Sequence, residues 1–300
     1  MPSAHARRLC PGLHIVSANF DKYRHESRLI RAIFADYTRR IEPLSLDEAY
    51  LDVTGSEHHQ GSATLIARAI RQRIKSELNL TASAGVAPNK FLAKIASDWD
   101  KPDGLFVILP EQIDDFVRAL PVARLFGVGK KTAEKLHRMG IYTCEDLRAL
   151  ELLELHRKFG SFGKHLHDLS RGIDDRPVVA RQGRKSLSVE NTYDRDLETV
   201  QDCLTELPDM LQSLKRRVAR SGMEIPVNKQ FIKLKFSDFS ATTVERTSFG
   251  IRDDLFRELI EEGFARRDKP VRLMGLGVRF QSPDAASFVQ LPLDYEPDME

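Results

Sequence analysis

The chain has 300 residues, of which 30% are charged and 41% hydrophobic, and its formal net charge is +2 at pH 7. This composition predicts a soluble, folded protein of more than one domain. The apolar runs have only strand or helix length, and the N-terminal residues MPSAHARRLCPG contain no apolar core of signal-peptide length, so we exclude a membrane protein and expect a cytoplasmic one.

The first third of the chain mixes strand-like and helical patterns, which predicts an α/β layer. Ser62 is the predicted N-cap of a helix whose apolar residues recur every four positions. The predicted strands are residues 44–54, 80–86 and 105–109, and the helical apolar positions are Ile66, Ile70 and Ile74. A second, short amphipathic helix is predicted at residues 88–99, with an apolar face of Phe91, Leu92, Ile95 and Trp99.

Short helices dominate residues 110–174. Strand signals vanish there, and glycines separate the helical pieces, so we predict a small all-helical domain. Residues 175–184 carry Asp, Arg, Pro and Gln with little apolar content, and we predict that they form a linker.

Strand signals return after the linker, in the order βαββαβ. This order is that of a split βαβ sheet with two helices on one face. Pro208 interrupts the first helix and predicts a kink or two shorter helices there. The predicted strands are residues 185–193, 229–236, 242–249 and 271–280, and the predicted helices are residues 198–221 and 253–264.

Two adjacent carboxylates, Asp47 and Glu48, lie in the strand-like segment PLSLDEAYLDVTG. Successive strand residues point to opposite faces, so the two converge on one site only if the backbone bends between them, which Pro43 and Ser45 favour. Carboxylate oxygens are hard ligands that suit Mg²⁺, and two such ions can assist phosphoryl transfer. The pair alone leaves a second interpretation open, an exposed acidic hairpin tip, which is the more common case.

The segment LFGVGKKTAEKLHRMGI, residues 125–141, resembles a helix-hairpin-helix motif. Gly127 and Gly129 leave backbone N–H groups at a helix N-terminus free to meet a phosphate, and Lys130 and Lys131 add positive charge. Such a motif binds the DNA backbone without reading its sequence. An ordinary helix–helix turn that needs glycine is the alternative.

Residues 213–236 contain seven basic residues and one acid, which favours a polyanion-facing surface. Within KQFIKLKF, strand alternation places Lys229, Phe231, Lys233 and Lys235 on the face opposite the core. Basic side chains interleaved with an aromatic one match a surface that tracks nucleic acid. A solvated sheet face is the alternative.

Five segments, in this order and at this spacing, resemble the Y-family translesion DNA polymerases of the bacterial DNA polymerase IV type. They are SLDEAYLDVTG, TASAGVAPNKFLAKIASDWDKPDG, FGVGKKTAEKLHRMG, RKSLSVE and VRLMGLGVRF. The resemblance extends over essentially the whole chain. It implies an α+β multi-domain fold: a palm with the catalytic hairpin at 18–109, an all-helical thumb with the helix-hairpin-helix at 110–174, and a βαββαβ little-finger domain at 185–281.

The family pattern implies roles for the matching positions. Asp47 and Glu48 would be two of three catalytic carboxylates that bind metal, with two Mg²⁺ ions as cofactors, and Lys101 in DKPDG would contact the incoming triphosphate. The implied DNA contacts are Gly127, Gly129, Lys130 and Lys131 in the thumb, and Arg184, Lys185, Ser186, Lys229, Lys233 and Lys235 in the little finger. Asp52 receives no role and is expected to be structural.

Residues 1–17 resemble a stretch inside the polymerase, a remnant of the fingers. The first palm strand would then be missing, together with the third carboxylate and the steric gate, the aromatic residue that excludes ribonucleotides. Asp21 is the first acid in the chain, but it matches a different part of the family and does not replace the third carboxylate. The implied function is template-directed DNA synthesis past lesions in DNA repair, by nucleotidyl transfer from deoxynucleoside triphosphates to a primer 3′ end. The alternative is a catalytically dead remnant that binds primer-template DNA because the third metal carboxylate is missing. On that ground we expect residues 1–300 to be inactive alone.

Residues 282–300 form a predicted acidic tail. Within it, Gln290, Leu291 and Leu293 resemble the short clamp-binding peptide that many bacterial polymerases carry. The expected partners are therefore a sliding clamp, primer-template DNA and deoxynucleoside triphosphates, and we expect the protein to be a monomer.

Overall fold

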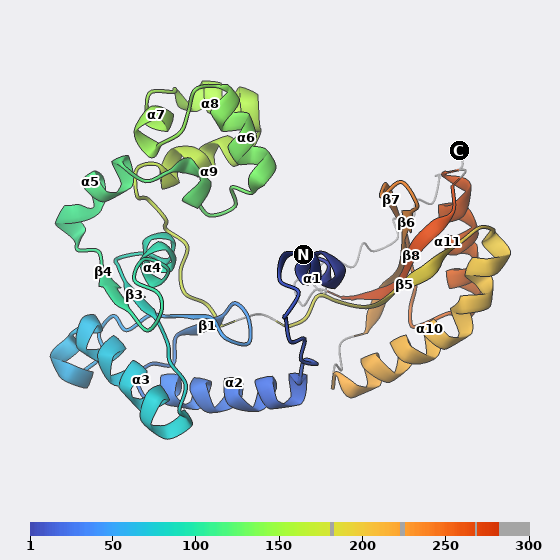
Figure 1. The fold of residues 1–300 in the computed structure, drawn as a ribbon, viewed down its shortest axis with the longest axis horizontal. Helices are drawn as coiled ribbons and strands as arrows, with labels where there is room; N and C mark the ends of the chain where they lie inside the picture. Colours follow the sequence, from blue (N-terminus) through green and yellow to red (C-terminus); the bar gives the residue numbers. More distant parts are fainter. Residues whose placement is uncertain (181–182, 223–225, 268, 282–300) are drawn as a thin grey trace, which may run out of the picture. The chain divides into compact units, whose positions relative to one another are not determined.

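The computed structural model describes residues 1–180, 183–222, 226–267 and 269–281. The chain divides into two compact units, Met1–Arg181 and Gln182–Glu300, which are described separately below (Figure 1). The boundary between them falls inside the predicted linker, residues 175–184. Among the described residues, no helix combines the length and the apolar character needed to cross a membrane.

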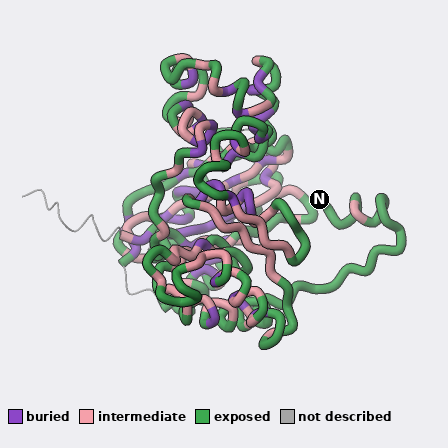
Figure 2. The backbone as a smooth tube through the Cα atoms, turned by 90° about the vertical axis from the view of Figure 1, so that its left-hand side faces the viewer, coloured by how far each residue is buried: buried purple, intermediate pink, exposed green. Residues whose placement is uncertain are grey.

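The first unit opens with two helices that sequence analysis did not predict. Helix α1 (Ser3–Leu9) buries none of its residues, and residues 1–19 are almost entirely exposed (Figure 2). Helix α2 (Phe20–Ala35) is capped by Asn19, whose Oδ1 accepts a hydrogen bond from the backbone N–H of Lys22 at 3.0 Å. Asn19 is the sequence signal that points to α2, since asparagine is a preferred N-cap.

Helix α3 (Ala63–Leu78) begins at the predicted cap. The hydroxyl of Ser62 accepts a hydrogen bond from the N–H of Leu65 at 3.3 Å. The three predicted isoleucines of α3 are buried and form a small core with Ile33 of α2. The prediction for this helix and its buried face is confirmed.

The strands of the first unit form two separate two-stranded sheets. One is an antiparallel hairpin and the other is a parallel pair. The strand predicted at 44–54 is wrong over residues 44–48, because the chain reverses there and the N–H of Leu44 donates to the carbonyl of Glu48 at 2.9 Å. It is also wrong over residues 52–54, because the strand ends at Leu51. The hairpin consists of β1 (Ile41–Pro43) and β2 (Ala49–Leu51), and the parallel pair consists of β3 (Ala84–Val86) and β4 (Leu105–Val107).

Helix α4 (Lys90–Ser97) follows β3, and the three apolar residues predicted in its interior are buried. The placement of Trp99 on the same buried face was wrong, because the helix ends before it. Trp99 is 46% exposed and packs against the rings of Phe106 and Phe116, with centroid distances of 5.6 and 5.0 Å.

Short helices follow β4, as predicted. They pack around one apolar core that also includes α4. Their bounds are η2 (Pro110–Gln112), α5 (Ile113–Arg118), η3 (Val122–Arg124), α6 (Lys130–Arg138), α7 (Cys144–Arg148), α8 (Leu152–Phe159) and α9 (Phe162–Leu169), and a further short helix, η1 (His58–Gly61), precedes α3. The one strand-like contact in this stretch is an isolated bridge between Pro121 and Thr143.

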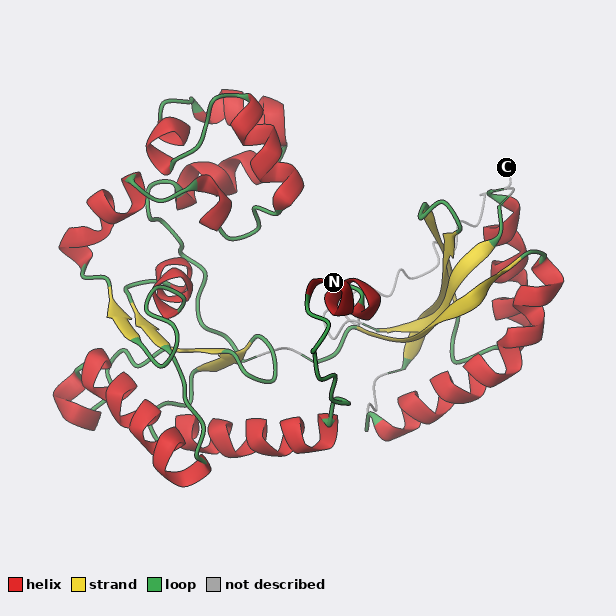
Figure 3. Ribbon diagram, in the orientation of Figure 1, coloured by secondary structure: helices red, strands yellow, loops and turns green. Residues whose placement is uncertain are grey.

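The second unit is a four-stranded antiparallel sheet in the order β5-β8-β6-β7, with both helices on one face (Figure 3). The predicted βαββαβ order is confirmed. The bounds are β5 (Ser186–Leu197), α10 (Val200–Arg220), β6 (Val227–Phe236), β7 (Ala241–Thr247), α11 (Asp253–Ala265) and β8 (Val271–Phe280).

Helix α10 is a single helix although Pro208 lies inside it, so the prediction of two shorter helices is wrong. A capping box starts it: Thr199 Oγ1 accepts from the N–H of Asp202 at 3.1 Å, and Asp202 Oδ2 accepts from the N–H of Thr199 at 2.8 Å. Burial of one face of the helix against the sheet compensates for the hydrogen bond that proline removes.

The sheet of the second unit buries one face and leaves the other open. Ile232, Leu234 and Phe236 of β6 are fully buried beneath α10 and α11. Helix α11 packs closely on β6 at Gly263, which has no side chain. A Cβ built on Gly263 would lie only 2.7 Å from Ile232. The alternate residues of β6 therefore form the open face, as predicted.

Candidate active site and DNA-binding surfaces

Asp47 and Glu48 lie in the exposed turn between β1 and β2. The hydroxyl of Ser45 donates to Asp47 Oδ1 at 2.6 Å, and Arg31 of α2 donates to the carbonyl of Ser45 at 3.1 Å. One hydrogen bond within the turn and one from α2 therefore hold the turn in place. The backbone bend that the two carboxylates require in order to face one site is present.

A chain of alternating charges leads from Glu48 along α4. Lys94 Nζ donates to Glu48 Oε1 at 3.0 Å and to Asp98 Oδ2 at 3.2 Å. Asp98 Oδ1 in turn accepts from Lys101 Nζ at 2.5 Å. This charge ladder, Glu48–Lys94–Asp98–Lys101, connects the candidate metal ligand to the candidate triphosphate ligand.

The ladder keeps its middle members ionised. Burial disfavours the charged form of Lys94, but the hydrogen bonds to Glu48 and Asp98 outweigh it and raise the pKa of Lys94. Burial likewise disfavours the charged form of Asp98, but Lys101 and Lys94 lower the pKa of Asp98 below its usual value.

The donor set at the turn fits a divalent ion in part. Two adjacent carboxylates at an exposed turn supply the oxygen ligands that a hard cation accepts, and such an ion takes its other ligands from water and substrate phosphates. Within the described ranges, no group of three or more His, Cys, Asp or Glu residues could hold a metal. Asp21 lies on α2, where it pairs with Arg24 and its side chain is 97% exposed.

A buried ion pair anchors the first strand of the hairpin to α4. Lys90 Nζ donates to Glu42 Oε2 at 2.6 Å, and the two side chains are only 8% and 18% exposed. Lys90 also lies over the ring of Tyr50 on β2, 5.1 Å from its centroid. Lys90 thus contacts both strands of the hairpin.

The same ion pair holds the first half of the predicted linker. Glu42 Oε2 accepts from the N–H of Val179 at 3.1 Å, and Lys90 Nζ donates to the carbonyl of Pro177 at 3.1 Å. Burial alone would raise the pKa of Glu42, but the hydrogen bonds from Lys90 and Val179 lower it. Residues 177–179 are therefore part of the first unit rather than a free tether.

Asp174 fastens the start of this segment to the N-terminus of α4. Its carboxylate accepts from the N–H of Phe91 at 2.9 Å and pairs with Arg176 at 2.7 Å. The side chain of Asp174 is 2% exposed; burial would raise its pKa, but Arg176 and the N–H of Phe91 lower it. Asn89, the cap of α4, donates to the carbonyl of Gly172 at 2.8 Å.

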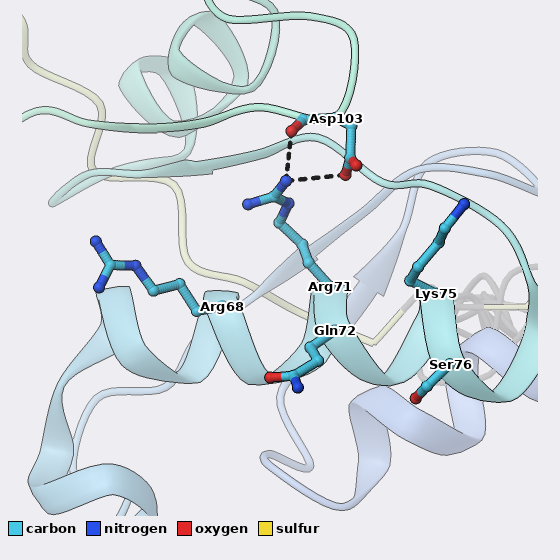
Figure 4. A pocket seen from close by; sticks show the side chains of 6 residues that line it. All are labelled: Arg68, Arg71, Gln72, Lys75, Ser76 and Asp103. Carbon is cyan, nitrogen blue, oxygen red and sulfur yellow. Dashed lines mark hydrogen bonds and ion pairs between the residues drawn. The ribbon is translucent and has the colours of Figure 1, made fainter.

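The loop that carries Lys101 is fixed from α3. Figure 4 shows Arg71 donating to both the carbonyl and the carboxylate of Asp103, at 2.5 and 2.9 Å. The pocket in that view, of about 340 Å³, contains none of the candidate catalytic residues. Its lining residues are Arg68, Arg71, Gln72, Lys75, Ser76 and Asp103.

The helix-hairpin-helix candidate has the geometry of a glycine turn before a helix. Gly127 has a φ of +86°, which favours glycine, and a Cβ there would meet the ring of Phe162 at 3.1 Å. Gly129 is the N-cap residue of α6 and has no side chain, so no side chain of the cap satisfies the first N–H groups of the helix. Lys130 and Lys131 are exposed at this end.

The open face of the second unit's sheet carries the predicted basic residues, but acids accompany them. Lys229 and Arg279 both pair with Glu245 at 2.8 Å, and Lys233 pairs with Glu190 at 3.1 Å. Hydrogen bonds from Lys229 and Arg279 lower the pKa of Glu245. Sequence analysis missed these acids because they lie on β5 and β7, away from the basic strand.

Two glycines of β8 make room for side chains on this open face. A Cβ on Gly277 would lie 2.2 Å from the ring of Phe231, and a Cβ on Gly275 would lie 2.9 Å from Glu190. The ring of Phe231 therefore rests on bare backbone, with the guanidinium of Arg279 5.4 Å from its centroid. Lys235 lies over the ring of Phe239, 4.6 Å from its centroid.

The remaining predicted contacts lie at the start of β5 or beyond the described chain. Arg184 and Lys185 are exposed, and Ser186 is the first residue of β5. The carbonyl of Lys185 accepts from the N–H of Phe280 at 3.0 Å. Gln290, Leu291 and Leu293 lie outside the described residues.

Three family models match successive parts of the chain. The impB/mucB/samB family matches residues 1–98, the DNA polymerase-iota thumb domain matches residues 123–174, and the impB/mucB/samB family C-terminal domain matches residues 184–293. DNA polymerase IV of Pseudomonas entomophila is 57% identical over 281 residues, which is 94% of this chain and 79% of that protein. The chain belongs to the Y family of DNA polymerases.

Other relatives and solved structures agree. DNA polymerase IV of Pseudomonas syringae pv. syringae is 54% identical over 95% of this chain and 81% of that protein. A Y-family polymerase chimera of Dbh and Dpo4 has a TM-score of 0.83 at 27% identity, over 93% of this chain and 82% of that chain. An insertion ternary complex of Dbh DNA polymerase has a TM-score of 0.61 at 26% identity, with the same coverage.

Membership of the Y family confirms the fold and the function that the motifs imply. The protein is a DNA-directed DNA polymerase of translesion synthesis and DNA repair, with DNA and deoxynucleoside triphosphates as substrates. Enzymes of this family are nucleotidyltransferases that generally use divalent metal ions. The alternative of a catalytically dead remnant is not supported.

Proposed function

We propose that Asp47 and Glu48 hold the divalent ions of this polymerase, and that these ions are Mg²⁺. The observation that carries this proposal is the reverse turn that presents two adjacent carboxylates beside the lysines of α4 and its following loop. Bound Mg²⁺ would activate the primer 3′ oxygen and stabilise the leaving pyrophosphate oxygen. Carboxylate and water ligands of this kind are those that Mg²⁺ prefers.

Lys101 is the proposed ligand of the incoming triphosphate. Its side chain is 52% exposed and its ammonium already binds an anion, Asp98. A triphosphate would accept from the same donor, and a compact ammonium is a common phosphate ligand in proteins. The hold of Arg71 on Asp103 keeps the loop of Lys101 in place for this contact.

Metal removal tests the proposed reaction. We expect purified residues 1–300 to extend a primer on a template with Mg²⁺ and all four deoxynucleotides, and we expect EDTA to abolish that extension while DNA binding persists. Phosphate contacts supply DNA affinity, and the metal supplies the chemistry, so the two should separate. Extension at an undiminished rate in EDTA would contradict a metal-dependent mechanism.

The turn at residues 126–129 is the proposed anchor for the DNA backbone in the thumb. Its support is the positive φ of Gly127, the uncapped start of α6 at Gly129 and the exposed ammonium groups of Lys130 and Lys131. A helix N-terminus with bare N–H groups binds phosphate through hydrogen bonds and the helix dipole. Binding of this kind is independent of base sequence.

Replacing Gly127 by Ala should weaken primer-template binding by roughly tenfold or more, since a lost charge-assisted hydrogen bond costs about 1.5–3 kcal/mol. The new Cβ would meet the ring of Phe162 and would force the backbone from φ +86°. Gly140→Ala is the matched control, because Gly140 has a φ of +77° and open space around it. Fluorescence anisotropy with labelled DNA measures both; equal losses would mean that the turn has no special part in binding.

The open face of the second unit's sheet is the proposed surface that tracks the template duplex. Its support is the row Lys229, Phe231, Lys233 and Lys235 on β6, with Arg279 beside it on β8. Arg184, Lys185 and Ser186 extend the same proposal to the start of β5. Because Glu190 and Glu245 already pair with three of these cations, a phosphate that binds there competes with a carboxylate.

Changing both Lys233 and Lys235 to Ala should reduce the slope of log K against log salt by roughly two units, about 0.9 for each phosphate lost. The physical reason is that each lysine that neutralises a phosphate releases counterions. Lys215→Ala is the matched control, since Lys215 is also ion-paired, with Asp253, but lies on α10 away from the open face. Binding titrations between 50 and 300 mM salt measure the slope for each variant. An unchanged slope in the double variant would mean that these lysines face solvent.

Three further proposals concern the protein partner, the oligomeric state and the cellular location of the enzyme. Gln290, Leu291 and Leu293 would bind a sliding clamp, their leucines entering an apolar groove and the glutamine making one polar contact. The polymerase would act as a monomer in the cytoplasm, where bacterial DNA lies. Co-purification with the clamp before and after deletion of residues 288–300 tests the first of these.

A further inference from the structure

Lys94 occupies a position that the motif assignments leave without a role. Its ammonium lies between Glu48, a proposed metal ligand, and Asp98, the acid that holds the proposed triphosphate ligand Lys101. Two of the three donors of Lys94 are used in these contacts. Lys94 is therefore the one member of the charge ladder that touches both of its acids.

Helix α4 is a rigid base for this lysine. Asn89 caps the helix, with its Oδ1 accepting from the N–H of Leu92 at 3.0 Å, and one face of the helix is buried in the core. Lys90, one turn before Lys94, holds Glu42 of β1. The two lysines are four residues apart, so they lie on the same side of α4 and hold two parts of one hairpin.

The contact of Lys94 restricts the carboxylate of Glu48. With Oε1 bound at 3.0 Å, the rotation of the carboxylate is limited and Oε2 stays available for another ligand. The side chain of Glu48 is 41% exposed and would otherwise move freely on the turn. Groups that hydrogen-bond to a metal ligand orient it, and their loss typically weakens metal affinity or activity.

We infer that Lys94 is a positioning residue of this polymerase: it orients Glu48 toward the metal and, through Asp98, holds Lys101 for the triphosphate. This inference rests on the proposed function of Glu48 and Lys101. The competing role is that of a counter-cation that occupies Glu48 and must leave before a metal binds. The two roles predict opposite changes in metal affinity when the ammonium is removed.

The test is Mn²⁺ binding to the purified chain, followed by the electron paramagnetic resonance signal of the free ion. Lys94→Met should weaken the affinity for Mn²⁺ by about 10–100-fold, the usual effect of removing a group that orients a ligand. Lys94→Arg keeps a cationic donor and should stay within about threefold of the parent, as expected when the hydrogen bond is retained. Lys75→Met, on α3, is the control: in the part of the chain that the structure describes, Lys75 forms no ion pair, and its loss should change nothing.

Asp47→Asn separates a failure of this inference from a failure of the metal site itself. If Asp47→Asn weakens Mn²⁺ binding and Lys94→Met does not, or if Lys94→Met tightens it, the positioning role is overturned while the metal site stands. If the parent binds no Mn²⁺, or Asp47→Asn binds it as the parent does, the proposed metal site is wrong and the inference falls with it. Equal losses in Lys94→Met and Lys94→Arg would assign Lys94 a packing role instead.

Steady-state kinetics supply a second readout. Lys94→Met should lower kcat through Glu48 and raise the KM for deoxynucleotide through Lys101, and Lys94→Arg should restore both. Thermal unfolding followed by the fluorescence of Trp99, the single tryptophan, checks that the variant is folded. A loss of thermal stability with unchanged kcat and KM would overturn the positioning role.

Discussion

Replacement of Asp47 or Glu48 by Ala should abolish template-directed synthesis and leave the affinity for primer-template DNA nearly unchanged. We expect a rate loss of at least about 10³-fold, because metal-ion catalysis is worth several kcal/mol and each ~1.4 kcal/mol is tenfold in rate. DNA affinity should persist because phosphate contacts supply it, and removing an acid lessens repulsion with the DNA backbone. Single-nucleotide primer extension and an anisotropy titration measure the two quantities.

Asp52→Asn is the matched control for this prediction. Asp52 belongs to the same motif but pairs with Arg40 at 2.7 Å and accepts from the N–H of Thr54 at 2.9 Å, so its carboxylate has a structural use. Its variant should keep most of the activity of the parent. Extension near the parental rate by either alanine variant at 47 or 48 would contradict the metal assignment.

Breaking the buried pair of Glu42 and Lys90 should lower the free energy of unfolding more than any other substitution proposed for this protein. Lys90→Met leaves a nearly buried carboxylate without its partner, which costs about 3–5 kcal/mol. The expected fall in the unfolding midpoint is roughly 6–20 °C for a unit of this size. Trp99 lies in the same unit, so its fluorescence reports on the unfolding of that unit.

The double variant Glu42→Leu with Lys90→Met should recover most of this stability, because an apolar pair of similar size carries no buried charge. Acid gives a second check. The lowered pKa of Glu42 means that its stabilisation is complete above its ordinary pKa of 4.5 and is lost as the pH falls through the lowered value. Lys90→Met should flatten this acid dependence; an unchanged acid profile and midpoint would show that the pair contributes little.

The elements with a regular apolar period are predictable from sequence. Strand β6 and helix α3 occur where the alternation of Ile232, Leu234 and Phe236 and the four-residue recurrence of Ile66, Ile70 and Ile74 place them. Such patterns report which face of an element is buried, whatever it packs against. The whole order of the second unit followed from them.

Local patterns failed where a contact from elsewhere sets the backbone. Residues 44–48 look like strand but form a turn, which hydrogen bonds of Ser45 and Arg31 hold. Pro208 does not divide α10, because packing of the helix on the sheet outweighs one lost hydrogen bond. The predicted linker is bound in its first half by Glu42, 137 residues away from Val179.

The sequence by itself determined which candidate groups this protein offers: the adjacent carboxylates of Asp47 and Glu48, the glycine turn before Lys130, and the basic strand β6. Only the tertiary structure decided which side chains contact these groups and which of their charges are paired with an opposite charge. Lys94 meets Glu48 across 46 positions, and Glu190 meets Lys233 across 43. Periodicity describes neighbours along the chain, whereas a charge is paired or free according to its neighbours in space, and those are set by how the elements pack.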